Sequence, residues 1–291
     1  MSKNGLPRKP LTKRRLKNLI LNVLKNPFNM VVLVSLIILF CLIIIPLLTM
    51  ISSTFTLAQG ELRRVQGHVG DFTLYYWKYI LTGKLASAVL WGPLKNSFIC
   101  GFFTVLVSVP LGSVLAWLMI RTDLPGKKIL GLLVTVPYMI PSWTKALAWL
   151  AMFRNSTSGA NGFLAGLGIP VPDWLAYGPI AIVLCMSMHY YAFSYIMVSG
   201  ALRSINSELE EMGEIQGASK AQILRHITLP LILPSVLSAT VMTISKSIGT
   251  YGVPANLGNR IGYYTLATKM RTFIDQGPQA VGYAMSIVLV L

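Results

Sequence analysis

Long stretches of this chain carry no charged residue. Twenty-five uncharged residues lie between Lys95 and Arg121, and 29 lie between Asp173 and Arg203. A helix needs about 20 apolar residues to cross the hydrocarbon core of a bilayer. The pattern therefore predicts an all-α integral membrane protein with about six transmembrane helices, near residues 30–51, 97–120, 129–152, 178–200, 228–248 and from 278 onward.

The composition supports this reading and argues against a soluble protein of the same size. Of the 291 residues, 54% are hydrophobic and 12% are charged. Soluble domains carry roughly 25% charged residues. The mean hydropathy of +0.63 agrees.

The net charge is +16, from 25 basic and 9 acidic residues. Basic residues are dense in the first 25 positions, and others follow the second and fourth predicted helices. The positive-inside rule then places the N-terminus in the cytoplasm, against anionic lipid. The long first outer loop is also basic, but long loops follow this rule weakly. The distribution explains the charge without nucleic acid as a partner.

We expect three segments along the chain. Residues 1–27 form a basic cytoplasmic segment, and residues 28–95 hold the first transmembrane helix, an uncleaved anchor, with its outer loop. Residues 96–291 form the transmembrane core, with a cytoplasmic loop at 204–230. The last helix breaks off at Leu291, and we expect this chain to be the first half or a fragment of a longer, fused protein.

No motif for catalysis or metal binding is found in the sequence. The three cysteines, Cys41, Cys100 and Cys185, lie inside apolar runs and are expected to pack as small hydrophobes. There is no phosphate-binding G-x-x-x-x-G-K-[ST], no H-E-x-x-H and no G-x-S-x-G. We therefore expect no cofactor, no metal and no enzymatic activity in this chain.

The cytoplasmic loop holds many of the scarce acidic residues. Four of the nine, Glu208, Glu210, Glu211 and Glu214, fall within seven positions. The simplest interpretation is a solvated charged face. The loop also retains apolar residues, which a fully solvated helix does not need. This combination favours a docking element for a cytoplasmic partner with a basic-rimmed groove.

Local signals predict a helix, a turn and a second helix in this loop. Ser207 followed by Glu210 is a capping box, which predicts a helix start. Gly217 is suited to end that helix because glycine adopts the left-handed conformation. Ser219 opens a second capping box, and the helix after it is expected to end at Pro230.

The same loop resembles a known motif. Glu211-Met-Gly, three residues, Gly217, nine residues and Ile227-x-Leu229-Pro230 match the spacing of the EAA loop of membrane subunits of binding-protein-dependent ABC importers. Where the motif has two alanines, this chain has Met212 and Gly213. Further similar segments are Pro110-Leu-Gly-Ser-Val-Leu-Ala-Trp, Arg121-Thr-Asp-Leu-Pro-Gly, Pro137-Tyr-Met-Ile-Pro141, Gly159-Ala-Asn-Gly162 and Tyr251-Gly-Val-Pro-Ala-Asn-Leu-Gly258, the last of which resembles the ferric-iron branch.

The resemblance implies a permease component with the methionine- and maltose-importer fold, in a bacterial cytoplasmic (inner) membrane. The implied partners are a cytoplasmic ATPase dimer, an extracytoplasmic solute-binding protein and a second permease domain, whether a fused half, a paralogue or a second copy. The implied substrate is ferric iron, with aminoalkylphosphonate, polyamine and thiamine as alternatives. A secondary transporter or a non-transport membrane scaffold is the alternative class. The implied ATPase-coupling residues are Glu210, Glu211, Gly213, Gly217, Ile227, Leu229 and Pro230.

Three cationic or titratable residues lie within or near the predicted helices. They are Lys145, His189 and Lys246. Charged groups in a membrane are costly and often functional, which makes these residues candidates for a translocation path that favours an anionic or anion-chelated solute. The alternatives are lysines that snorkel to the outer interface and a histidine that packs with a hydrogen bond.

Overall fold

A computed structural model describes residues 27–61, 65–155, 159, 161–206 and 208–290. The predicted basic segment 1–27 lies outside these residues except for Pro27. Apart from an isolated bridge between Thr56 and Phe72, the described chain consists of helices and their connections. The helices are α2 (Pro27–Ser53), η1 (Gln59–Glu61), α3 (Tyr75–Leu81), η2 (Ser87–Trp91), α4 (Gly92–Arg121), α5 (Lys127–Met139), α6 (Ser142–Phe153), α7 (Phe163–Gly166), α8 (Asp173–Ala176), α9 (Pro179–Ser204), α10 (Glu208–Ile215), α11 (Lys220–Ile223), η4 (Leu224–Thr228), α12 (Leu229–Ile248), α13 (Gly252–Leu257), η5 (Asn259–Ile261), α14 (Leu266–Gln276) and α15 (Gln279–Val290).

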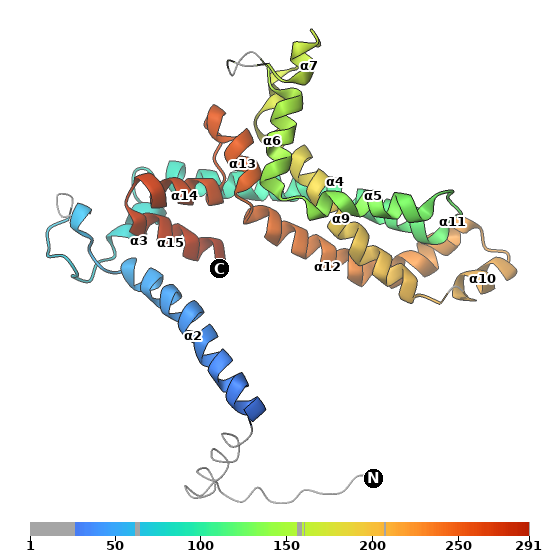
Figure 1. Ribbon diagram of the computed structural model, residues 1–291, viewed down its shortest axis with the longest axis horizontal. Coiled ribbons are helices and arrows are strands. Elements are labelled where there is room, and N and C mark those ends of the chain that lie inside the picture. The colour runs from blue at the N-terminus through green and yellow to red at the C-terminus, as the bar shows by residue number, and fades with distance from the viewer. Residues whose placement is uncertain (1–26, 62–64, 156–158, 160, 207, 291) are drawn as a thin grey trace, which may run out of the picture.

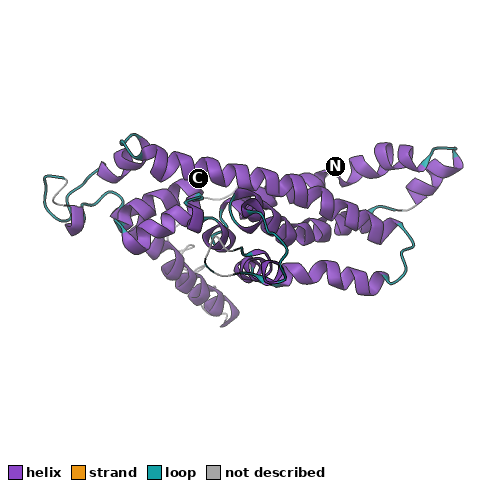
Figure 2. Cartoon of the chain, turned by 90° about the horizontal axis from the view of Figure 1, so that it is seen from above, coloured by secondary structure: helices purple, strands orange, loops and turns teal. Residues whose placement is uncertain are grey.

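The centre of the molecule is a bundle of long helices (Figure 1). Helix α4 packs against α9 and α12, and α5 packs against α9. At one end of the bundle α14 and α15 form a hairpin against α3, and at the other end α10 and α11 extend beyond the rest. The view from above shows the same projecting end (Figure 2). The bundle thus presents α10 away from its core.

Close packing of α4 on α9 depends on one glycine. A Cβ atom at Gly112 would lie 2.4 Å from the Tyr191 carbonyl oxygen and 2.7 Å from Ser194 Cβ. Small residues let membrane helices approach in this way. Ala116 and Val198 are fully buried beside this contact.

Four helical stretches are long and apolar enough to cross a membrane: 27–53, 87–121, 173–204 and 220–248. They cover four of the predicted spans. Helix α2 has no buried residue and stands away from the bundle (Figure 1). A helix that is apolar on all sides belongs in lipid or against another membrane helix.

The prediction of one continuous helix over 129–152 is wrong. Helices α5 and α6 have 13 and 12 residues and meet at a sharp bend (Figure 1). The bend lies at Ile140 (φ −80°, ψ 131°) and Pro141 (ψ 142°). Proline lacks a backbone N–H and pushes the residue before it into an extended conformation. The region predicted from 278 onward is α15, a 12-residue apolar helix within the described chain.

The helix after Gly217 also differs from the prediction, because it does not end at Pro230. Residues 220–248 run on as one helical stretch, with a π-helical turn at Leu224–Thr228 directly before Pro230. Proline removes one hydrogen-bond donor from a helix. The wider turn at this point absorbs that loss, so the segment after Gly217 is continuous with α12.

Candidate functional site

The first short helix of the loop at 204–230 is α10, which begins at Glu208. The Glu208 backbone N–H donates to Asn206 Oδ1 at 3.2 Å, and the Asn206 amide donates to Glu208 Oε2 at 2.9 Å. The predicted cap Ser207 lies outside the described residues. Helix α10 begins directly after the predicted cap position, and the capping box itself stays a prediction.

The turn after α10 follows the sequence prediction. Gly217 has φ +83°, which is the left-handed conformation. The Gly217 N–H donates to the Glu214 carbonyl and the Ala218 N–H to the Gly213 carbonyl, at 2.9 and 3.0 Å. This pair of bonds is a Schellman motif. The capping box of Ser219 and Gln222 then starts α11. Both helix ends are thus fixed by local bonds.

Glu210 ties α10 to the bundle. Its Oε2 lies 3.1 Å from Arg121 Nε at the end of α4, an ion pair without the alignment of a hydrogen bond. Its Oε1 accepts a 2.7 Å hydrogen bond from Thr228 Oγ1 in the π-helical turn. The Arg121 and Glu210 side chains are only 15% and 19% exposed. One carboxylate therefore joins α4, α10 and the start of α12.

Gly213 lies on the inner side of α10. A Cβ atom there would lie 3.2 Å from both Ile223 Cγ1 and Ile227 Cδ1. The predicted residues Gly213 and Ile227 are thus brought together in the packing of α10 on the following helix. Leu229 and Pro230 form the start of α12, and Leu229 is 48% exposed.

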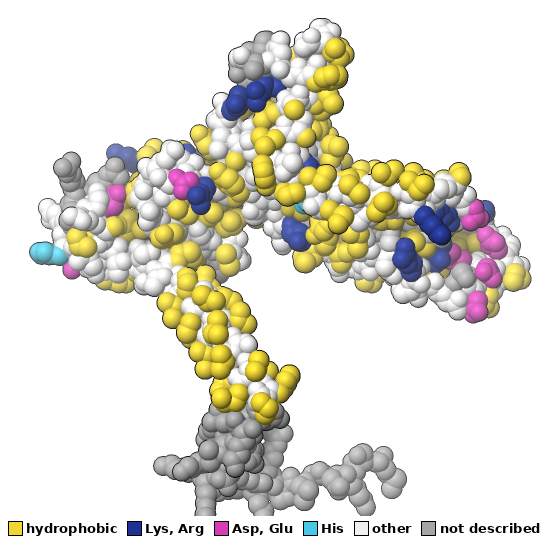
Figure 3. Space-filling model, viewed as in Figure 1, with side chains coloured by type: hydrophobic (Ala, Val, Ile, Leu, Met, Phe, Trp, Pro, Cys, Tyr) yellow, Lys and Arg dark blue, Asp and Glu magenta, His cyan; other side chains and the backbone are white. Residues whose placement is uncertain are grey.

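The outer side of α10 carries acidic and apolar residues together. Glu211 is exposed, and Leu209, Met212 and Ile215 are 47%, 56% and 85% exposed. Glu214 is also exposed, but it lies one turn after Glu210 and lines the same pocket as Glu210 and Arg121. Acidic side chains gather at this end of the molecule (Figure 3). The structure therefore separates two neighbouring acids: Glu210 faces its own chain and Glu211 faces outward.

The three candidate path residues come together from α6, α9 and α12. Lys145 Nζ contacts His189 Nδ1, so the imidazole accepts at this nitrogen. The His189 ring stacks on Tyr138 with centroids 5.4 Å apart, and Tyr138 stacks on Phe193 at 5.8 Å. Lys246 Nζ lies 5.5 Å from the Phe193 ring centroid. Among the described side chains neither lysine forms an ion pair with a carboxylate. The cluster is therefore cationic and aromatic.

Sequence reasoning missed several of these contacts. Arg121 and Thr228 are far from Glu210 in sequence, and no spacing links them. Tyr138 and Phe193 look like ordinary membrane aromatics in the sequence, and only the packing of α5 against α9 brings their rings together. Arg121 and Tyr138 lie in segments that resemble the family, but the resemblance does not show what their side chains contact.

The long apolar helices define a helical membrane protein, and comparison with known proteins identifies its family. Residues 108–291 match the family described as binding-protein-dependent transport system inner membrane component, and the chain belongs to that family. It is therefore a transport component and not an enzyme.

Curated relatives are permease proteins of two kinds. A probable sulfate transport system permease protein cysT of Marchantia polymorpha is 27% identical over 180 residues, which is 60% of this chain and 59% of that protein. Sulfate permease CysT of Salmonella typhimurium is 24% identical over 200 residues, or 68% of each chain. A putative 2-aminoethylphosphonate transport system permease protein PhnV of the same organism is 28% identical over 219 residues, or 75% of each.

Solved structures share the fold. A bacterial ABC transporter that imports the acidic polysaccharide alginate aligns with a TM-score of 0.66 at 18% identity, covering 93% of this chain and 92% of that one. The MetNI methionine ABC transporter aligns with a TM-score of 0.52 at 21% identity, covering 71% and 88%. These likenesses agree with the predicted methionine-importer fold.

Proposed function

We propose that this chain is one permease half of an ATP-driven importer, coupled through α10 to a separate cytoplasmic ATPase. The observation that carries the proposal is the orientation of the two adjacent acids. Glu210 fastens α10 to α4 and α12, whereas Glu211 is exposed beside Met212 and Ile215. A docking helix needs both features, because it must hold a partner and pass a movement to the bundle.

The mechanical side follows from the contacts of α10. Closure of an ATPase dimer acts as a rigid-body movement, which a loose loop would absorb. Here α10 is capped at both ends, packed on Ile227 through Gly213 and bonded to Arg121 and Thr228. Displacement of α10 is therefore transmitted to α4 and, through the continuous helical stretch, to α12.

The proposed partners follow from what this half lacks. One helical bundle does not enclose a path, so a second membrane domain has to complete it. An ATPase with basic groups at its docking cleft suits the acidic outer side of α10. An extracytoplasmic solute-binding protein is supported by the family description. We place α10 in the cytoplasm and the far end of α12 outside.

We propose an oxyanion as the solute, in the class of sulfate or an aminoalkylphosphonate. The cluster of Lys145, His189 and Lys246 holds two cations with no carboxylate partner in the described chain. Positive side chains in a pore select for anions. The relatives named for sulfate and 2-aminoethylphosphonate support the same class. They do not support ferric iron, and a cationic polyamine would be repelled by the lysines.

The test is uptake by the purified complex in proteoliposomes, with labelled sulfate and labelled 2-aminoethylphosphonate. We expect uptake of at least one of them to require ATP and to fall at least about fivefold in Lys246→Gln. The matched control is Lys84→Gln, which removes an exposed lysine outside the cluster. Uptake driven without ATP would refute the coupling. Unchanged anion uptake in Lys246→Gln would refute the role of the cluster.

A further inference from the structure

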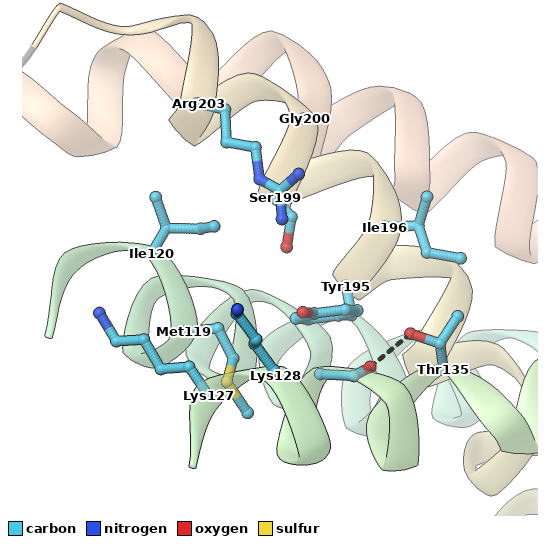
Figure 4. A pocket seen from close by; sticks show the side chains of 11 residues that line it. Met119, Ile120, Lys127, Lys128, Thr135, Tyr195, Ile196, Ser199, Gly200 and Arg203 are labelled. Atoms are coloured by element: carbon cyan, nitrogen blue, oxygen red, sulfur yellow. Dashed lines mark hydrogen bonds between the residues drawn. The ribbon is translucent and has the colours of Figure 1, made fainter. Parts of the chain in front are cut away.

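A second cationic site lies apart from the cluster of Lys145, His189 and Lys246 and apart from the contacts of α10. It is a cavity of about 580 Å³ between the ends of α4, α5 and α9. Lys127 and Lys128 come from α5, and Arg203 comes from α9 on the opposite side (Figure 4). Its lining includes no acidic residue. We infer that this cavity binds the phosphate group of an anionic phospholipid at the headgroup layer of the membrane.

The charges at the mouth are available for a ligand. Lys127 Nζ lies 3.6 Å from the fully exposed Asp123, a weak surface pair. Neither Lys128 nor Arg203 forms an ion pair within the described ranges. An arginine with free N–H groups is suited to a phosphate because its planar fork matches two oxygens at once.

A buried hydroxyl points to the same ligand. Ser199 is 6% exposed, and its Oγ has no hydrogen-bond partner. Figure 4 shows this oxygen directed into the cavity, between Arg203 and the ring of Tyr195. A buried hydroxyl without a partner is unfavourable, so a phosphate oxygen within reach would satisfy it. Thr135, in contrast, already donates to the Gly131 carbonyl at 2.7 Å.

The position of the cavity favours a lipid over a soluble anion. Arg203 and Tyr195 are eight residues apart on α9, which corresponds to about 12 Å along the helix. The cations thus lie at the mouth, the Ser199 hydroxyl about one turn deeper and the Tyr195 hydroxyl about two turns deeper, as in a headgroup layer. Beside the mouth, Ile129, Leu132 and Leu133 of α5 are 68%, 64% and 58% exposed and offer an apolar surface for acyl chains. Basic cavities between membrane helices bind anionic headgroups in this way.

The experiment titrates the purified full chain in neutral detergent with short-chain phosphatidylglycerol, and counts bound lipid by native mass spectrometry. Phosphatidylcholine and inorganic phosphate are titrated in parallel. We expect saturable binding of phosphatidylglycerol that weakens about tenfold in Arg203→Gln. Arg225→Gln is the matched control, since it removes an exposed arginine near the same end of the bundle, and it should leave binding within about twofold.

Ser199→Ala separates a binding role from a structural one. Removal of an unsatisfied buried hydroxyl should leave the melting temperature unchanged or raised, while lipid binding weakens by at least about threefold. Equal losses in Arg203→Gln and Arg225→Gln would show diffuse charge attraction and overturn the site. Phosphate binding as tight as phosphatidylglycerol binding would show a soluble oxyanion site and overturn the lipid assignment. Full lipid binding in Ser199→Ala would also overturn it.

Discussion

Replacement of Glu210 by glutamine should weaken the structure, whereas the same change at Glu211 should weaken only docking. Glu210→Gln removes the charge that compensates Arg121, and both side chains are more than four-fifths buried. Loss of one member of a buried pair costs about 3–5 kcal/mol. The remaining amide still accepts from Thr228, so we expect a loss of about 2 kcal/mol.

The assay is thermal unfolding of the purified chain, followed by intrinsic tryptophan fluorescence. Two kcal/mol corresponds to a fall of about 4–8 °C in melting temperature for a chain of this size class. Glu211→Gln should change it by less than about 2 °C, since exposed substitutions stay within about 0.5 kcal/mol.

A double-mutant cycle isolates the pair. Arg121→Gln combined with Glu210→Gln should cost little more than either single change, with a coupling of about 1.5 kcal/mol. Additive losses, or an unchanged melting temperature in Glu210→Gln, would refute the role of this ion pair. An equal fall in Glu211→Gln would refute the division between inward and outward acids.

Two glycine substitutions test the backbone argument. Gly217→Ala should destabilise the loop by about 1–2 kcal/mol, because φ is +83°. No neighbouring atom crowds the new Cβ atom, so the loss measures the backbone conformation alone. Gly166→Ala, which also has open space but no positive φ, serves as the control in thermal unfolding. Gly112→Ala should lower stability by about 1–3 kcal/mol, because the new Cβ atom forces α4 away from α9. Gly131→Ala, whose new Cβ atom would lie 3.6 Å from the Tyr195 hydroxyl, should be neutral within about 1 kcal/mol. Equal melting temperatures of the two variants would contradict the close approach of α4 and α9.

The lengths of the uncharged runs, together with glycine and capping residues, predicted much of the fold. The uncharged runs located α2, α4, α9 and α12, and Gly217 and Ser219 located the turn and the second helix start. The break at Pro141 was not predicted, because membrane helices often contain proline and hydrophobicity alone does not show whether neighbours restore the missing bond. The same holds for Pro230, where a π-helical turn keeps the helix intact.

The candidate site was predicted in part. The motif spacing located α10 and gave both Glu210 and Glu211 as coupling residues, but it did not predict that Glu210 bonds within its own chain. Their division depends on the rotation of α10 against Arg121 and Thr228, which are fixed only by tertiary packing. The polar residues Lys145, His189 and Lys246 were proposed as path candidates from their cost in a membrane, and that role stays a prediction. The rings of Tyr138 and Phe193, which join them, meet through the packing of α5 against α9, and sequence spacing does not show that packing.

The most direct test of the coupling claim is purification of the tagged chain from mild-detergent membranes, with its partners identified and quantified by mass spectrometry. We predict a P-loop ATPase at a fixed stoichiometry, retained in Asp123→Ala and lost in Glu211→Ala at an unchanged melting temperature. Asp123 is an exposed acid near the same end of the bundle and off the outer side of α10. A chain that purifies without an ATPase with or without nucleotide, or that keeps the ATPase fully in Glu211→Ala, would contradict the proposed docking of α10.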